Sequence, residues 1–578
     1  MINMITKELI EEFFISMLEA CTCPSSSYLC MPDNDSFTYC IKEIMHTLQN
    51  NISNNLNNNY SKQLIENFYR YMQRDMVFRE VDTIQYSNLM LKLKQYSEGD
   101  KTSKQEQYTY FEYIYRVFSY AYRDKLNNII IDSYNNPKDT YEYYYRIFNC
   151  FMNELLANGM NYKYMFYICK KYKSGKFNSF LDFVEYLSYN NADSFDIYLP
   201  INNATDKNIE YLRGNGQQVE IIDGKTYGKV YSNKCIDFFF VIKQNMTRIE
   251  SMFNMLRLYT NSSIGFDIDA DIIVESRFFA EREMISFSEI ICYKGRSPYY
   301  RHLDRTLESL DKLKDVDKVL YHKVLNVISY AEKDMDICNQ SSYVDNWISL
   351  ETLCTLSGRK TGYESVEIVL PQILASRLIV NEVTDILKNA YKGDNKIILE
   401  EFIEKSISNE IDIKPINGVY DKFRVYYYSR ILKDVAKLKL KYDEVENRVR
   451  LDLLRIYMLR NEYVHESNVH AFHSMQQIKL KNLLLASLDE FFKTLNRRIG
   501  LEYSNFGLNY EIFTQLLSRC DARKVAFKVL LEKNCRVGNS IFLSANLDNE
   551  EVKLEEFILN VLKGNLNLFK RYIPTEEY

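Results

Sequence analysis

Helix-breaking residues are scarce along this chain. Its 578 residues include 17 glycines and 8 prolines, and long stretches mix apolar with charged residues. Because glycine and proline disfavour helix interiors and mark turns, this scarcity favours helices over a loop-rich β architecture. We therefore predict a mainly α protein, and its length indicates several domains rather than one.

Two helical regions flank a short region of different character. Residues 1–190 carry apolar residues at three- and four-residue spacing between polar breaks, which predicts a helical N-terminal region. Residues 191–290 contain β-branched and aromatic runs and an Asp223-Gly224 turn signal, so we expect a small β-containing domain. The runs lie at 195–201, 218–231 and 236–242, and a helix is expected at 247–259.

Helical patterns return after residue 290. Residues 291–500 are predicted to form a helical bundle, and residues 501–578 a small helical appendage. Helices are expected near 300–314, 318–334, 341–357, 366–391, 420–464 and 474–498.

Charge and hydropathy limit the function classes. The formal net charge is −5, so a general polyanion binder is excluded and any nucleic acid must meet a local basic surface. Glutamates interrupt the apolar pattern of the first helix, and no apolar run is long enough to span a membrane. We expect a cytoplasmic protein without membrane contact. Cys21, Cys23, Cys30 and Cys40 form the only cysteine cluster in the sequence. Their spacing fits no zinc pattern, and whether they bind a metal stays open.

The most informative stretch is an Arg-Asn-x-x-x-His sequence near the end of the helix predicted at 420–464. Arg460 follows Leu453 and Ile456 on one stripe of that helix, beside a buried seam where a charge needs a partner. Asn461 and His465 are four residues apart on a neighbouring face, where the amide can orient the imidazole. The edge between the two faces can hold a phosphate against a guanidinium while an imidazole handles a proton.

These three side chains are sufficient for RNA cleavage without a metal or other cofactor. The ribose 2′-hydroxyl attacks the adjacent phosphate, and an imidazole with a pKa near neutrality transfers the proton. A guanidinium stabilises the extra negative charge of the phosphorane. We predict Arg460, Asn461 and His465 as the catalytic residues. A histidine that only caps the end of a helix remains the alternative interpretation.

The surrounding helices resemble the ApeA-like and abortive-infection branches of the HEPN superfamily over residues 318–500. A helix at 320–335 precedes a Trp-x-x-Leu-Glu sequence at Trp347, Leu350 and Glu351. A long helix at 369–391, the Arg-Asn-x-x-x-His helix and a closing helix at 478–492 follow in the order typical of that family. An insertion of about 25 residues after Gly393 departs from its tightest form.

The resemblance implies a bundle that dimerises, or forms a higher homo-oligomer, so that two motifs line one cleft. It implies a metal-independent endoribonuclease that acts on RNA, with tRNA as one candidate. It further implies a bacterial anti-phage (abortive infection) toxin whose N-terminal part, with residues 191–290 as the candidate sensor, senses a phage-derived protein or nucleic acid.

Other polar residues are candidates for supporting roles. Glu351 and Arg377 each place a charge in an apolar stripe, so we expect them to pair with each other or with Arg455 or Arg460. Between residues 420 and 460, eleven basic residues oppose six acidic ones, and tyrosines are interleaved, a composition that suits single-stranded RNA. The RNA-binding candidates are Lys437, Lys439, Lys441, Arg448, Arg450 and His470.

Two other functions compete with this hypothesis. In the first, the bundle has no turnover and serves only binding or dimerisation, although such a module does not need the Arg-Asn-x-x-x-His sequence. Alternatively, Asp267, Asp269 and Asp271 alternate as on one face of a strand, as in metal-dependent nucleotidyltransferases, but the upstream Gly-Ser turn of those enzymes is missing.

Overall fold

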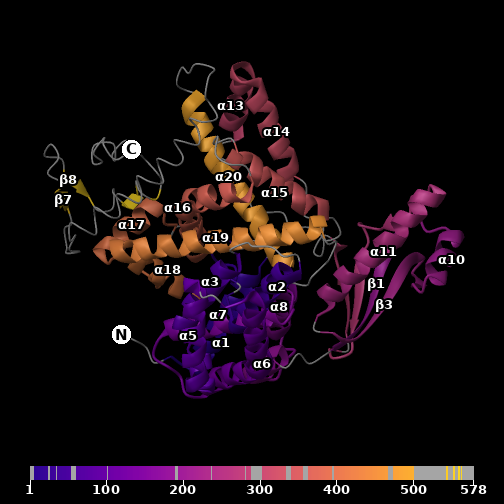
Figure 1. Cartoon of the computed structure of the whole chain (residues 1–578), viewed down its shortest axis with the longest axis horizontal. Helices are drawn as coiled ribbons and strands as arrows, with labels where there is room; N and C mark the ends of the chain where they lie inside the picture. The colour runs from indigo at the N-terminus through magenta and orange to yellow at the C-terminus, as the bar shows by residue number, and fades with distance from the viewer. Residues whose placement is uncertain are drawn as a thin grey trace.

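The structure is a computed structural model that describes most of the chain up to residue 499. It is mainly helical, with a small antiparallel sheet in the middle of the sequence, which confirms the predicted fold class (Figure 1). None of the helices described has both the length and the apolar character needed to cross a membrane. The described residues are 5–23, 27–33, 35–53, 60–99, 102–188, 193–235, 237–279, 281–287, 303–332, 340–355, 362–393, 396–465, 473–499, 542–544, 551–553, 558–559 and 562.

Helices α1 to α9 form the N-terminal part. Side-chain caps set several of their ends: Ser103 and Glu106 cap the start of α6 reciprocally, and Gly99 ends α5 in the left-handed conformation. The core is rich in stacked rings, such as Phe37 on Tyr122 with centroids 4.7 Å apart. The helices are α1 (Lys7–Thr22), α2 (Phe37–Ser53), α3 (Tyr60–Arg74), α4 (Val77–Val81), α5 (Thr83–Glu98), α6 (Lys104–Asn135), α7 (Tyr141–Ala157), α8 (Tyr162–Lys173) and α9 (Phe180–Ser188).

The middle sheet has the strand order β2-β3-β1-β5-β6, all antiparallel, with β4 also paired to β1. The predicted hairpin turn is confirmed, since Asp223 and Gly224 have φ values of 51° and 77° between β2 and β3. Helix α11 packs against β1 and β3 (Figure 1). The elements are β1 (Asp193–Asn202), α10 (Asp206–Gly214), β2 (Gln218–Ile222), β3 (Lys225–Cys235), α11 (Phe238–Thr260), β4 (Gly265–Phe266), β5 (Ile272–Ser276) and β6 (Glu281–Ile285).

Two predictions in this region are wrong. The run at 236–242 is not a strand but the start of α11, because its apolar residues continue a helical stripe from Phe238 and Ile242 to Met246. The alternating aspartates do not share a strand face either, because β4 ends at Phe266. Asp267 begins a turn, in which its carboxylate accepts the Asp269 backbone N–H at 3.2 Å.

The C-terminal helices surround one long helix, α19, which runs between the N-terminal helices on one side and α15, α16 and α20 on the other (Figure 1). The single helix predicted at 420–464 is two helices, because the Asp434 carboxylate accepts the backbone N–H groups of Ala436 and Lys437 and starts α19 anew. The helices are α13 (Leu303–Val316), α14 (Lys318–Glu332), α15 (Gln340–Thr355), α16 (Tyr363–Ala390), α17 (Leu399–Ser408), α18 (Val419–Leu432), α19 (Val435–His465) and α20 (His473–Ile499).

Helix α18 packs on the N-terminal part although it belongs to the second half of the sequence. The Phe13 ring of α1 meets the rings of Tyr420 and Phe423 at centroid distances of 5.5 and 5.4 Å. The core is therefore continuous between the N-terminal helices and the predicted nuclease bundle.

The region predicted as a helical appendage, 501–578, lies mostly outside the described residues. Its described part includes two short antiparallel strands, β7 (Phe542–Ser544) and β8 (Glu551–Lys553), which the sequence did not predict.

Candidate functional site

Arg460 and Asn461 lie in the last two turns of α19. The Arg460 Nη1 donates to the Asn461 side-chain oxygen at 3.1 Å. The Arg460 Nε is buried and has no hydrogen-bond partner, and within the described part of the chain no carboxylate pairs with this half-buried guanidinium. A partly desolvated cation without a counter-charge is poised to bind an anion.

The two predicted histidines fall at the edge of what the structure describes. His465 is the last residue of α19, but its side chain lies outside the described residues, and so does all of His470. The expected contact between Asn461 and His465 stays a prediction.

A third histidine, which the sequence did not single out, lies beside the motif. His46 of α2 places its Nδ1 3.3 Å from a carboxylate oxygen of Glu462, and the two side chains are 36% and 11% exposed. Glu462 directly follows Asn461 and lies three residues before position 465. His46, its partner, therefore lies beside the turn of α19 that carries Asn461 and position 465. No local pattern links His46 to residue 462; only the packing of α2 on α19 brings them together.

Helix α15, which carries the Trp-x-x-Leu-Glu sequence, packs directly on the motif helix. Trp347 is fully buried, and its ring lies 5.6 Å from that of Tyr457, three residues before Arg460. The Tyr343 hydroxyl donates to the Ile456 carbonyl at 2.9 Å. The bundle thus fixes the end of α19 from the side that faces away from α2.

The predicted pairing of Glu351 with Arg377 is wrong. Arg377, 5% exposed, lies 3.3 Å from Asp489 and 3.7 Å from Glu490 of α20. Glu351 forms no hydrogen bond or ion pair among the described residues. Arg377 therefore joins α16 to α20, and neither residue supports Arg460 directly.

The Arg455 guanidinium is engaged by carboxylates and does not contact Arg460. This guanidinium pairs with Glu43 of α2 at 2.9 Å and with Asp35 at 3.0 Å, and a carboxylate oxygen of Asp452 lies 3.6 Å away. Burial raises the pKa values of both Glu43 and Asp35, although the guanidinium partly offsets this effect. These pairs fasten the N-terminal helices to α19.

Asp452 continues this network into the bundle. It pairs with Lys479 of α20 at 2.9 Å, both side chains being fully buried, and accepts the Tyr28 hydroxyl at 2.6 Å. Burial lowers the pKa of Lys479 to about 8, against the attraction of Asp452. Burial also opposes ionisation of Asp452, but Lys479 and Arg455 outweigh it and hold that pKa below its usual value.

Most predicted RNA-binding residues are engaged within the protein. Lys437, Lys439 and Lys441 each pair with an acidic residue three or four positions away in the sequence. The Arg448 guanidinium is turned inward onto the segment before α2. It donates there to the backbone carbonyls of Tyr28, Leu29, Met31 and Pro32.

The open question of a cysteine metal site finds no support among the described residues. Cys21 and Cys30 are buried neighbours that interact with one another, and the Cys21 thiol lies 3.9 Å from the Tyr420 hydroxyl. Cys40 is buried near Asp35 and Arg455 instead. In the described ranges no three His, Cys, Asp or Glu side chains converge as metal ligands.

Comparison of the chain with family models, with curated proteins and with solved structures gave no match.

Proposed function

We propose that this protein is a metal-independent endoribonuclease of the HEPN type, with Arg460, Asn461 and His465 at its active site. The observation that carries the proposal is the half-buried Arg460 guanidinium, which has a neighbouring amide but no carboxylate partner among the described residues. A scaffold gains nothing from such a charge, whereas a phosphate would neutralise it.

In the proposed reaction, the ribose 2′-oxygen forms a bond to the adjacent phosphorus and the bond to the 5′-oxygen breaks. One proton leaves the 2′-hydroxyl and another reaches the departing 5′-oxygen, which produces a 2′,3′-cyclic phosphate. His465 transfers a proton, Arg460 stabilises the phosphorane, and Asn461 orients the guanidinium through its side-chain oxygen. His46, held by Glu462, supplies a second imidazole within a helical turn.

We also propose that the N-terminal helices regulate this activity in an anti-phage response, as a homodimer or higher oligomer. The support is physical coupling: α2 contacts α19 through Arg455 and again through Glu462, on either side of Arg460. A trigger that moves α2 would therefore move the end of the helix that carries the motif.

The test is incubation of purified full-length protein with total RNA, including tRNA, in EDTA. We expect cleavage that leaves 2′,3′-cyclic phosphate ends and falls at least about 100-fold in both Arg460→Ala and His465→Ala. Arg430→Ala, which removes an exposed guanidinium paired with Glu142, serves as the matched control and should cleave normally. Cleavage that requires a divalent metal and is lost in Asp267→Ala would contradict the proposal.

A further inference from the structure

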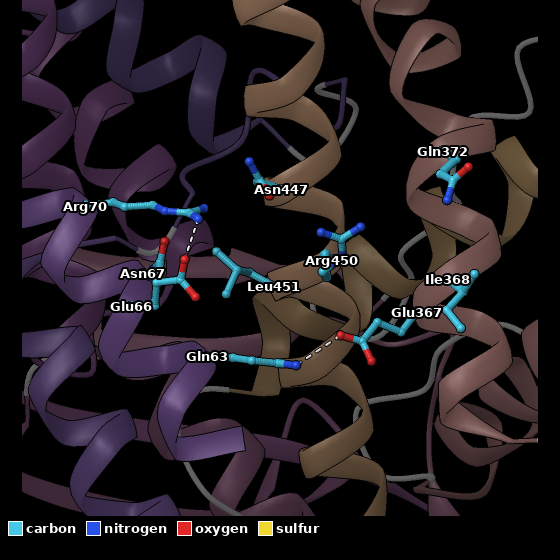
Figure 2. Close-up of a pocket in the computed structure, with 10 residues that line it drawn as sticks. All are labelled: Gln63, Glu66, Asn67, Arg70, Glu367, Ile368, Gln372, Asn447, Arg450 and Leu451. Carbon is cyan, nitrogen blue, oxygen red and sulfur yellow. Dashed lines mark hydrogen bonds and ion pairs between the residues drawn. The ribbon is translucent and has the colours of Figure 1, made fainter. Parts of the chain in front are cut away.

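A groove lies between three helices, about three helical turns before Arg460 along α19. It has a volume of about 450 Å³ and lies where α3 of the N-terminal part meets α16 and α19 (Figure 2). We refer to it as the α3–α16–α19 groove. Its lining residues are Gln63, Glu66, Asn67, Arg70, Glu367, Ile368, Gln372, Asn447, Arg450 and Leu451.

Four of the ten lining residues carry amide side chains, and two of these amides make no hydrogen bond with a described residue. The Gln63 side-chain N–H donates to the Glu367 carboxylate at 3.1 Å across the groove, as Figure 2 shows. The Gln63 amide oxygen accepts no hydrogen bond from a described residue. The half-buried amides of Gln372 and Asn447 make no hydrogen bond with any described residue. Half-buried amides that offer both donors and acceptors match the edges of nucleobases.

The charges in the groove nearly cancel, which favours an uncharged ligand group over a phosphate. Arg70 pairs with Glu66, and Glu367 is occupied by Gln63. Arg450, 37% exposed, likewise pairs with Glu446 at 3.2 Å, but it lies on α19, the helix that carries the motif. This arrangement suits a base in the groove with its backbone phosphate near Arg450.

The helix geometry connects the groove to the motif. Arg450 and Asn461 are eleven residues apart, so they lie on nearly the same face of α19 and about 16 Å apart along its axis. Asn447 and position 465 are eighteen residues apart, which is about five full turns, and so share a face as well.

Aromatic rings lie between the groove and the motif. Tyr457 stacks on Tyr363 with centroids 4.5 Å apart, and Tyr60 approaches both rings edge-on. Each of these tyrosines precedes or follows a groove-lining residue by one or two turns of its own helix. Tyr363 is buried and the three rings pack on one another, so they join α3, α16 and α19 between the groove and the motif.

We propose that the α3–α16–α19 groove binds an unpaired nucleobase of the RNA strand, a few nucleotides from the scissile phosphate. The proposal rests on the proposed ribonuclease function and adds how the substrate strand is held. It also gives the N-terminal part a direct role in substrate binding, because α3 forms one wall.

The test uses full-length protein and a fluorescent random-sequence RNA of about 12 nucleotides with 2′-O-methyl groups, which cannot be cleaved. The double variant Gln372→Ala/Asn447→Ala should bind this RNA about tenfold more weakly by fluorescence anisotropy. The isosteric pair Gln372→Glu/Asn447→Asp preserves the shape of the groove and should weaken binding further. Asn389→Ala, an exposed amide on α16 outside the groove, is the matched control and should bind normally.

Cleavage assays separate this proposal from the function on which it rests. The double variant should lose about tenfold in kcat/KM on the cleavable long RNA but retain normal cleavage of a dinucleotide, which is too short to reach the groove. Unchanged RNA affinity and unchanged long-substrate cleavage, in a protein whose wild type cleaves RNA, would overturn the groove proposal alone. If the wild-type protein never cleaved RNA but bound it in a way that depended on the groove, the ribonuclease proposal would be overturned and the groove proposal would stand.

Discussion

Two arginines five residues apart on α19 have opposite surroundings. The Arg455 guanidinium is almost fully buried and is matched by carboxylates from Glu43 and Asp35, with Asp452 close by. The Arg460 guanidinium is half-buried and has only the Asn461 amide beside it. The first has its charge neutralised by the fold, and the second lacks a neutralising partner among the described residues. Arg455 thus belongs to the architecture and Arg460 is available to a ligand.

The largest test of this contrast concerns stability. Arg455→Ala leaves two buried carboxylates without their cation and should lower the free energy of unfolding by about 3–5 kcal/mol. Arg460→Ala removes a charge that the fold does not neutralise and should cost less than about 1 kcal/mol. Urea unfolding followed by circular dichroism measures both changes.

Arg430→Ala is the matched control for that experiment. Arg430 pairs with Glu142 at 3.3 Å, but both side chains are 44% exposed, so its removal should change stability by no more than about 0.5 kcal/mol. A loss for Arg460→Ala as great as that for Arg455→Ala would show that both arginines are structural, and the contrast would fail.

A second pair of arginines on α19 sharpens the comparison. Arg448 is held by backbone carbonyls, whereas Arg450 lies at the edge of the groove. Arg448→Met should destabilise the protein by about 1–3 kcal/mol, because buried carbonyls lose their donor, and leave RNA affinity unchanged. Arg450→Met should weaken RNA binding and reduce its salt dependence, with stability altered by no more than about 0.5 kcal/mol.

Urea unfolding and anisotropy titrations at two salt concentrations distinguish these outcomes. The expected result is a separation of the two effects between the two variants. If Arg448→Met weakened RNA binding without lowering the free energy of unfolding, Arg448 would bind RNA rather than hold the backbone carbonyls in place.

Local patterns in the sequence predicted the parts of the fold that depend on nearby residues. The Asp223-Gly224 turn follows from two adjacent residues that tolerate positive φ, and α16 or α20 from the spacing of apolar side chains. The break between α18 and α19 was missed, because one capping aspartate at position 434 interrupts a stripe that continues on both sides.

The site could be predicted only in part for a different reason. Arg460 and Asn461 are adjacent, and their contact is local. The partners of Arg455 lie 412 and 420 residues away, and His46 reaches Glu462 from the other end of the chain. An isolated charge on an apolar stripe indicates that a partner is needed, but tertiary packing alone decides which of many carboxylates supplies it.

The smallest expected effect concerns the pH dependence of the network behind Arg455. The pKa of Lys479 is about 8 in the folded protein and about 10.4 in an unfolded chain. Between these values the unfolded state binds more protons, so the contribution of Lys479 to stability increases as the pH rises. The unfolding free energy of the wild type minus that of Lys479→Met should increase by about 1 kcal/mol per pH unit from pH 8 to about 9.5.

The difference between the two proteins is the informative quantity. Buried thiols such as those of Cys40 and Cys354 have raised pKa values, so they lower stability as the pH rises, but they do so equally in both proteins. Lys437→Met, which removes a 47%-exposed lysine from α19, should show no such slope relative to wild type. Parallel pH profiles for wild type and Lys479→Met would mean that water reaches this lysine. The Lys479–Asp452 ion pair would then not be shielded from water. The contrast between Arg455 and Arg460 would lose its basis, because it requires a dry contact between the N-terminal helices and the bundle.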